Sequence, residues 1–216
     1  MNERIARTRW GASHVIIAVN AVMLVATGFS RNAETLLHFG ATYPPAISSG
    51  EYWRLITAVF LHGGIFHFLL NAVALMAFGP ALETIYGRWR FVLLYLAAGV
   101  AGNAVSFAFG PVNSVGVGAS GAIFGLLGGF LAFSFRRRHL PIGAQGVRAV
   151  MVIAGINLFI GATVPGIDNW AHVGGLLAGA LVGLIYEALS RTPLLAGMIG
   201  PGAAMIIAGL LVGRRR

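Results

Sequence analysis

The sequence lacks cysteine and lysine and has few charged residues of either sign. The absence of cysteine excludes disulfide bonds, thiolate metal sites and a cysteine nucleophile. Only 10% of the 216 residues are charged, whereas about 25% are charged in an ordinary soluble domain. With 15 basic and 6 acidic residues, the chain cannot cover a water-facing surface with charge. The composition therefore argues strongly against a soluble globular fold, and it excludes disorder.

Hydrophobic residues make up 57% of the chain, and the mean hydropathy is +0.82. A membrane-spanning helix needs about 20 apolar residues, so the chain has room for about six or seven spans. Seven apolar segments, each bounded by charge, proline or glycine, lie at 11–29, 57–79, 90–109, 115–135, 147–164, 170–188 and 193–213. The sequence therefore predicts an all-α fold, a polytopic bundle of membrane helices.

All basic residues are arginines, and the net charge of +9 raises the question of nucleic-acid binding. The arginines occur in short clusters between the apolar segments, at 4–9, 88–90, 136–138 and 214–216. This arrangement is typical of anchors that flank membrane spans. We therefore expect the lipid bilayer, and no nucleic acid, as a partner.

The distribution of arginine predicts the orientation in the membrane. With a cytoplasmic N-terminus, only Arg31 and Arg54 face outward before the last segment. Ten arginines then face the cytoplasm: Arg4, Arg7, Arg9, Arg88, Arg90, Arg136, Arg137, Arg138, Arg148 and Arg191. The positive-inside rule favours this orientation. The first segment resembles a signal peptide, but it is longer than a signal core and lacks a clear cleavage site, so we interpret it as a retained span.

The longest connection is the stretch 30–56, which contains two prolines and several aromatic residues. Its composition suits a loop in the outer membrane interface, where amphipathic aromatic side chains settle. An ordinary solvated loop fits the composition equally well.

The chain contains 31 glycines, many of them within the apolar segments. Small residues let helix backbones approach closely in lipid. We expect close helix packing at Gly99, Gly102, Gly118, Gly121, Gly125, Gly174, Gly175 and Gly179.

Polar side chains inside the apolar segments are costly and usually face the interior of a bundle. His67 and Asn71 are four residues apart in the second segment, so they share one helix face. Counted from the inner helix ends at about 1.5 Å per residue, Ser120 lies roughly 23 Å up and His172 roughly 22 Å up. By the same count His67 lies about 18 Å and Asn71 about 12 Å up. The four side chains should therefore converge in the outer half of the membrane.

A converging serine and histidine indicate nucleophilic catalysis. A serine hydroxyl becomes a nucleophile when a base, usually neutral imidazole, takes its proton. The oxyanion that then forms needs donors, which a histidine, an asparagine and a backbone N–H at a helix start can supply. No buried carboxylate completes a triad, because Asp168 is expected in a loop and Glu83 at the inner end. The sequence therefore predicts a serine–histidine dyad.

His62 also lies in the second segment, five residues before His67. This spacing predicts that it points away from His67, closer to the outer end. A direct role of His62 in the site and a hydrogen bond from its side chain to a loop carbonyl are equally consistent with this position.

Several motifs resemble the rhomboid intramembrane serine proteases. Gly118-Ala119-Ser120-Gly121 resembles the family's G-x-S-G motif, and the segment from His62 through His67 to Asn71 resembles its H-x4-H-x3-N motif. Ala171-His172-Val173-Gly174-Gly175 resembles A-H-x-x-G, Trp53-Arg54 resembles a W-R pair, and Glu83 with Gly87 resembles E-x3-G. The resemblance covers about residues 50–190, with the motifs in the family's order.

The resemblance implies hydrolysis of a peptide bond in or beside the transmembrane segment of a single-pass membrane protein. Ser120 would be the nucleophile and His172 the general base. The oxyanion hole would comprise His67, Asn71 and the backbone N–H of Ser120. Gly118, Gly121 and Phe124 would support the site, which would open toward the outer face of the cell membrane. No cofactor or metal is implied.

The same resemblance divides the chain into a short cytoplasmic tail (1–10), a rhomboid-like protease domain (11–190) and an additional C-terminal span (191–216). The chain departs from the family pattern in two places. Residue 124 is phenylalanine where some members have tyrosine, although either ring could stack on His172. Many bacterial members have six spans, whereas a seventh is predicted for this chain.

Two other functions were weighed against proteolysis. A non-catalytic relative would bind transmembrane segments, but such relatives usually lack the serine or the histidine. A small transporter or channel could use His67 and His172 as a proton relay. It would need charged groups lining a path through both leaflets, and the inner half of this sequence has none.

We expect segment 193–213 to span the membrane and to place Arg214–Arg216 outside, because its roughly 21 apolar residues are enough to cross. The three terminal arginines favour the cytoplasm instead. A C-terminal reporter that is active only in the cytoplasm should give no signal. A signal would mean that the segment does not cross and that the chain has six spans.

Overall fold

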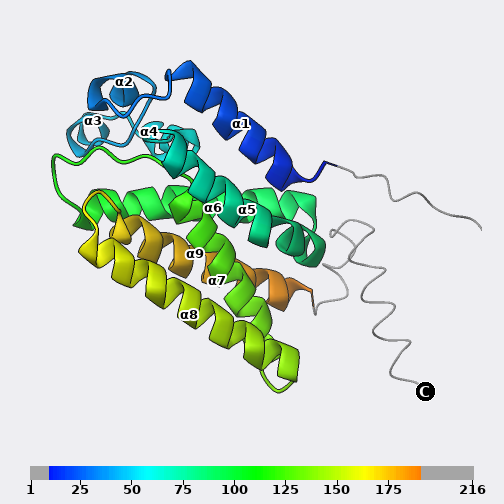
Figure 1. The fold of residues 1–216 in the computed structure, drawn as a ribbon. Coiled ribbons are helices and arrows are strands. Elements are labelled where there is room, and N and C mark those ends of the chain that lie inside the picture. The colour runs from blue at the N-terminus through cyan, green and yellow to red at the C-terminus, as the bar shows by residue number, and fades with distance from the viewer. Residues whose placement is uncertain (1–9, 191–216) are drawn as a thin grey trace, which may run out of the picture.

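The computed structural model describes residues 10–190, which fold into a bundle of helices (Figure 1). The long elements are α1 (Ala12–Ala26), α5 (Ile65–Tyr86), α6 (Arg88–Phe109), α7 (Ser120–Arg136), α8 (Pro141–Thr163) and α9 (Asn169–Leu189). Between α1 and α5 lie the short helices α2 (Ala33–His38), α3 (Pro44–Ser48) and α4 (Arg54–Thr57), followed by the 3₁₀ turn η1 (Ala58–Phe60). The predicted all-α fold is therefore confirmed.

Among the described residues, four helices are long and apolar enough to cross a membrane: α5, α6, α8 and α9. Two further apolar helices are shorter, since α1 has 15 residues and α7 has 17. Each of the first six predicted segments thus overlaps one of these six helices. The seventh segment, 193–213, lies outside the described residues.

Three of the predicted helices have bounds that differ from the structure by five residues or more. The second helix begins at Ile65 instead of residue 57, and it continues through Pro80 to Tyr86. The depths of His67 and Asn71, which were counted from the end of the predicted segment at residue 79, are therefore wrong. The fourth helix begins at Ser120, because residues 115–119 form a non-helical connection, and the fifth begins at Pro141 instead of residue 147.

The stretch 30–56 was predicted as a loop, but it contains two short helices and the start of a third. Arg54 holds it together by donating hydrogen bonds to the backbone carbonyls of Leu37 and Ala41, at 2.8 and 3.0 Å. The same guanidinium pairs with Glu51 at 2.7 Å. A single antiparallel bridge between Thr42 and Gly116 joins this stretch to the connection between α6 and α7. Local side-chain bonds thus order a segment that lacks apolar periodicity.

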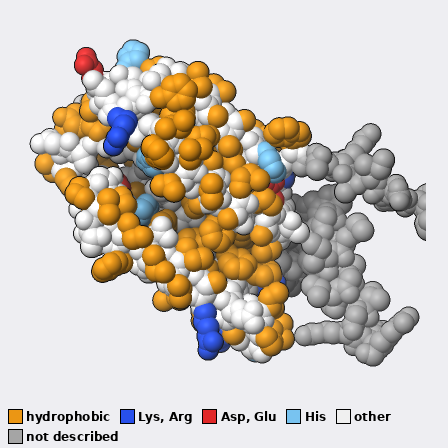
Figure 2. All heavy atoms as spheres, in the orientation of Figure 1, with side chains coloured by type: hydrophobic (Ala, Val, Ile, Leu, Met, Phe, Trp, Pro, Cys, Tyr) orange, Lys and Arg blue, Asp and Glu red, His pale blue; other side chains and the backbone are white. Residues whose placement is uncertain are grey.

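Helices α5, α7 and α9 all begin at the end of the bundle where α2–α4 lie, which we call the site end (Figure 1). Within residues 10–190, Arg31 and Arg54 lie at the site end. Six arginines lie at or near the opposite end: Arg88, Arg90, Arg136, Arg137, Arg138 and Arg148. Apolar side chains cover most of the face seen in Figure 2, as expected for helices that contact lipid.

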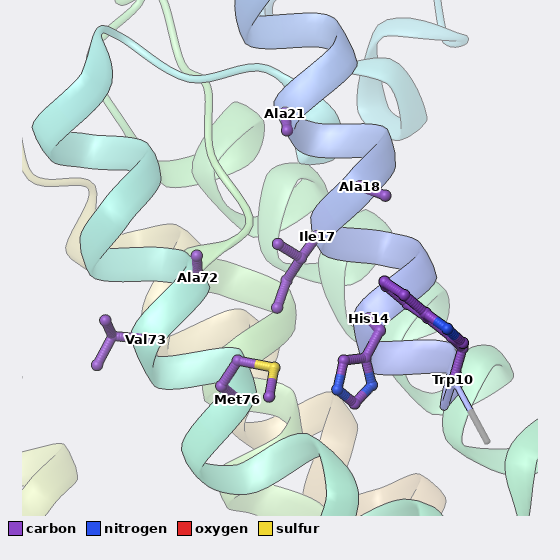
Figure 3. A pocket seen from close by; sticks show the side chains of 8 residues that line it. All are labelled: Trp10, His14, Ile17, Ala18, Ala21, Ala72, Val73 and Met76. Atoms are coloured by element: carbon purple, nitrogen blue, oxygen red, sulfur yellow. The ribbon is translucent and has the colours of Figure 1, made fainter. Parts of the chain in front are cut away.

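Helix α1 is attached to α5 through Glu83. Its carboxylate accepts hydrogen bonds from the backbone N–H groups of Ala12 and Ser13, at 2.6 and 2.8 Å, and from the Ser13 hydroxyl at 2.6 Å. These bonds satisfy donors that the first turn of α1 leaves free. An apolar groove of about 420 Å³ lies between the two helices (Figure 3), lined by Trp10, His14, Ile17, Ala18, Ala21, Ala72, Val73 and Met76. None of the predicted site residues lines it, so the groove is separate from the candidate site.

Helices α7 and α9 pack backbone against backbone through glycines, as the sequence predicts. A Cβ atom on Gly175 would overlap the carbonyl oxygen of Gly121, and one on Gly179 would overlap that of Gly125. Helix α6 joins the same contact, because a Cβ on Gly102 would lie 2.6 Å from the carbonyl oxygen of Ala171. These contacts fix the spacing of α7, which carries Ser120, and α9, which carries His172.

We predict that Gly179→Ala lowers the free energy of unfolding by about 1–3 kcal/mol, because the added methyl group cannot fit without moving a backbone. Gly155→Ala on α8 is the matched control, because a Cβ there meets no atom within 4 Å. The control should be neutral or slightly stabilising, since alanine favours a helix more than glycine does. Unfolding in detergent measures both, and equal effects would refute the proposed packing constraint.

Candidate active site

The structure brings Ser120 and His172 into hydrogen-bond distance, 2.9 Å between Oγ and Nε2. Ser120 is the first residue of α7, and His172 lies in the first turn of α9. The two residues are 52 positions apart in the sequence, and the glycine contacts of α7 and α9 bring them together. A nucleophile and its general base must lie within hydrogen-bond distance of each other, and this pair meets that requirement.

Phe124 lies one turn after Ser120, and its ring stacks on the ring of His172. The two ring centroids are 4.2 Å apart and the planes differ by only 4°. Both residues are buried. The stacking predicted from the sequence is therefore confirmed, and it fixes the plane of the imidazole.

The two glycines beside Ser120 are required for different structural reasons. Gly118 has a φ of +129°, which side chains rarely allow, and a Cβ there would lie 2.8 Å from the ring of His67. A Cβ on Gly121 would lie 3.2 Å from the carbonyl oxygen of Ala171. Glycine at these positions therefore lets the backbone before Ser120 approach His67 and lets α7 approach α9.

His67 lies in the first turn of α5, beside the Gly118 backbone. Its Nδ1 accepts a hydrogen bond from the backbone N–H of Gly63 at 3.3 Å, which orients the ring. Asn71 is buried one turn further along, and its Nδ2 donates to the carbonyl of His67 at 2.9 Å. An amide nitrogen has two N–H bonds, so the second remains for another acceptor.

His62 lies before α5 and not within it, and the prediction that it points away from His67 is wrong. Its side chain is fully buried, and its ring meets the ring of His67 edge to face at 5.2 Å and that of Phe68 at 5.6 Å. Burial, and to a lesser extent the His67 ring, lowers the pKa of His62 to about 4. A neutral His62 therefore supports His67 by packing.

Asp168 has a structural role that the sequence analysis did not predict. It lies in the loop directly before α9, as expected, and it is the N-cap of that helix, where its carboxylate accepts hydrogen bonds from the Ala171 backbone N–H and from the Ser106 hydroxyl. An aspartate directly before an apolar helical segment is an N-cap signal and could have indicated this role. The Nδ1 atom of His172 has no partner within residues 10–190, so Asp168 does not form a hydrogen bond to this imidazole.

Helices α5, α7 and α9 each present their N-terminal turn to this site. Backbone N–H groups of a first turn lack partners within their own helix, and the macrodipole places partial positive charge there. The site is therefore suited to hold negative charge beside a serine nucleophile. No group of three histidine, cysteine or acidic residues within the described part of the chain could hold a metal ion.

Comparison with known proteins identifies the family. The family model described as "Rhomboid domain" matches residues 49–188. This range includes Ser120, His67, Asn71 and His172. The chain belongs to the rhomboid family. The matched range begins before α4 and ends within α9.

Named rhomboid proteins are similar over most of this chain. Rhomboid protease GluP of Bacillus subtilis (strain 168) is 44% identical over 170 residues, 77% of this chain and 33% of GluP. Putative rhomboid protease YdcA of the same strain is 34% identical over 79% of this chain and 85% of YdcA. Rhomboid-like protease 1 of Toxoplasma gondii is 38% identical over 72% of this chain and 54% of that protein. The chain thus spans a third of GluP and about half of the Toxoplasma protein.

Proposed function

We propose that this chain is an intramembrane serine endopeptidase that cleaves the transmembrane segment of membrane-protein substrates, or the chain beside it. The observation that carries the proposal is the 2.9 Å distance between Ser120 Oγ and His172 Nε2. Membership of the rhomboid family, in which relatives bear the name protease, supports it.

In the proposed reaction, His172 is neutral and carries its proton on Nδ1, so that Nε2 accepts the proton of Ser120. The Oγ atom then attacks the scissile carbonyl carbon and forms a tetrahedral oxyanion. The histidinium returns its proton to the leaving amine, the C–N bond breaks, and an acyl-enzyme remains. Water, deprotonated by the same imidazole, attacks this ester, and the acid product and Ser120 are released.

The oxyanion would be bound by the backbone N–H of Ser120, the ring of His67 and the second N–H of Asn71. The first donor lies at the start of α7, where the helix dipole favours negative charge. The other two lie on the first two turns of α5, and the ring of His67 lies next to Gly118. Donors fixed in a desolvated site stabilise developing charge more than water does.

The site end would face the outside of the cell membrane, with the N-terminus in the cytoplasm. Within residues 10–190 the opposite end carries six arginines and the site end two, and the positive-inside rule places the arginine-rich end in the cytoplasm. Substrates would be single-pass membrane proteins cleaved near their outer end.

The two alternatives, a non-catalytic relative and a proton-relaying transporter, are less well supported. The serine and the histidine are both present and lie in contact. A proton relay would need titratable groups that continue through the bundle. At the opposite end, Arg137 and Glu187 instead neutralise each other in an ion pair at 2.9 Å. Proteolysis gives Ser120, His172, His67 and Asn71 roles in a single function.

We predict that Ser120→Ala and His172→Ala each abolish cleavage while the protein still accumulates in the membrane. The double variant should be no worse than either single variant, because the two side chains act as a unit. The assay is co-expression with a panel of tagged single-pass proteins. Comparable cleavage by Ser120→Ala would end the serine-protease proposal.

We predict that Asn71→Ala lowers kcat about 10²–10³-fold, the usual cost of one oxyanion-hole donor. KM should change little, because this hydrogen bond forms mainly in the transition state. His67→Ala should have a similar effect. If the residues only brace the bundle, thermal stability in detergent will fall and turnover per folded molecule will survive.

A further inference from the structure

Asp168 anchors the turn of α9 that carries His172. Its Oδ1 accepts a hydrogen bond from the backbone N–H of Ala171 at 2.9 Å, and its backbone carbonyl accepts one from the N–H of His172 at 3.2 Å. The other carboxylate oxygen, Oδ2, accepts from the hydroxyl of Ser106 on α6. One side chain therefore fixes the start of α9 and ties it to a neighbouring helix.

Within the described part of the chain, no ion pair neutralises the charge of Asp168. The salt bridges within residues 10–190 join Arg54 to Glu51 and Arg137 to Glu187. Asp168 precedes His172 by four residues, which corresponds to one helical turn, about 6 Å along the axis. Among the acidic residues in the described part of the chain, only Asp168 lies within one turn of the proposed base along the chain.

The proposed reaction creates a need for this charge. When Ser120 attacks, His172 becomes a buried imidazolium in the first turn of a helix. The helix macrodipole places partial positive charge at that end, which disfavours a cation. A carboxylate at the N-cap opposes this effect. Asp168 is partly buried and His172 is buried, so water screens their interaction less than it would in bulk solvent.

We propose that Asp168 is a positioning residue for the base. It holds the first turn of α9 against α6, and its negative charge stabilises the imidazolium of His172 through space, without a hydrogen bond to Nδ1. This inference rests on the proposed function, because it assigns the general base to His172. It differs from a catalytic triad, since the carboxylate bonds to Ser106 and to the helix start and not to the imidazole.

The decisive variant is Asp168→Asn, because asparagine retains an oxygen for the cap and a polar group for Ser106 while losing the charge. Two controls accompany it. Asp168→Ala removes the charge and the cap together, and Ser106→Ala removes only the contact to α6. Each purified chain, together with Ser120→Ala, is reconstituted in liposomes with a tagged single-pass protein that the wild type cleaves. The values of kcat, KM and the thermal midpoint are measured for each.

We expect Asp168→Asn to lower kcat about tenfold, with KM and the thermal midpoint close to those of the wild type. Asp168→Ala should lower both kcat and the midpoint, and Ser106→Ala should retain more kcat than Asp168→Asn. Wild-type kcat in Asp168→Asn, or equal losses in Asp168→Asn and Ser106→Ala, would overturn the proposed effect of charge. Activity in Ser120→Ala would instead refute the proposed function itself, so the two failures are distinct.

Discussion

The backbone contact between α7 and α9 is the constraint on which the rest of the structure depends. Serine has a short side chain, so its hydroxyl reaches an imidazole on another helix only if the two backbones nearly touch. Gly121 and Gly125 on α7 meet Gly175 and Gly179 on α9 without intervening side chains. Lipid provides no hydrophobic force between helices, so such close dispersion contacts must hold them. The 2.9 Å contact of Ser120 with His172 follows from this packing.

The same packing determines the electrostatics of the site. Helices α5, α7 and α9 run in one direction, so their N-terminal turns meet at the site end (Figure 1). Three first turns concentrate unsatisfied N–H groups and partial positive charge at one place. This favours an oxyanion but disfavours a protonated histidine. The carboxylate of Asp168, which caps the helix that bears His172, reconciles these two requirements.

The sequence predicted the all-α bundle and the meeting of Ser120 with His172, because apolar length and buried polar residues are strong signals in a membrane protein. It misplaced the start of α5, since the apolar run continues through the 3₁₀ turn before Ile65. It also placed His62 away from His67, because helical spacing does not apply before the helix begins. The contact between Asp168 and Ser106 could not be predicted, because the two residues are 62 positions apart in the sequence and only the fold brings them together.

The central claim is that His172 activates Ser120 for nucleophilic attack. The most direct measurement is labelling of the purified chain with a fluorophosphonate probe, followed by mass spectrometry of its peptides. The account predicts a single adduct, on Ser120, which is lost when His172 is replaced by alanine while the bundle remains folded. An unlabelled wild-type chain, an adduct on another serine, or undiminished labelling of Ser120 in His172→Ala would contradict it.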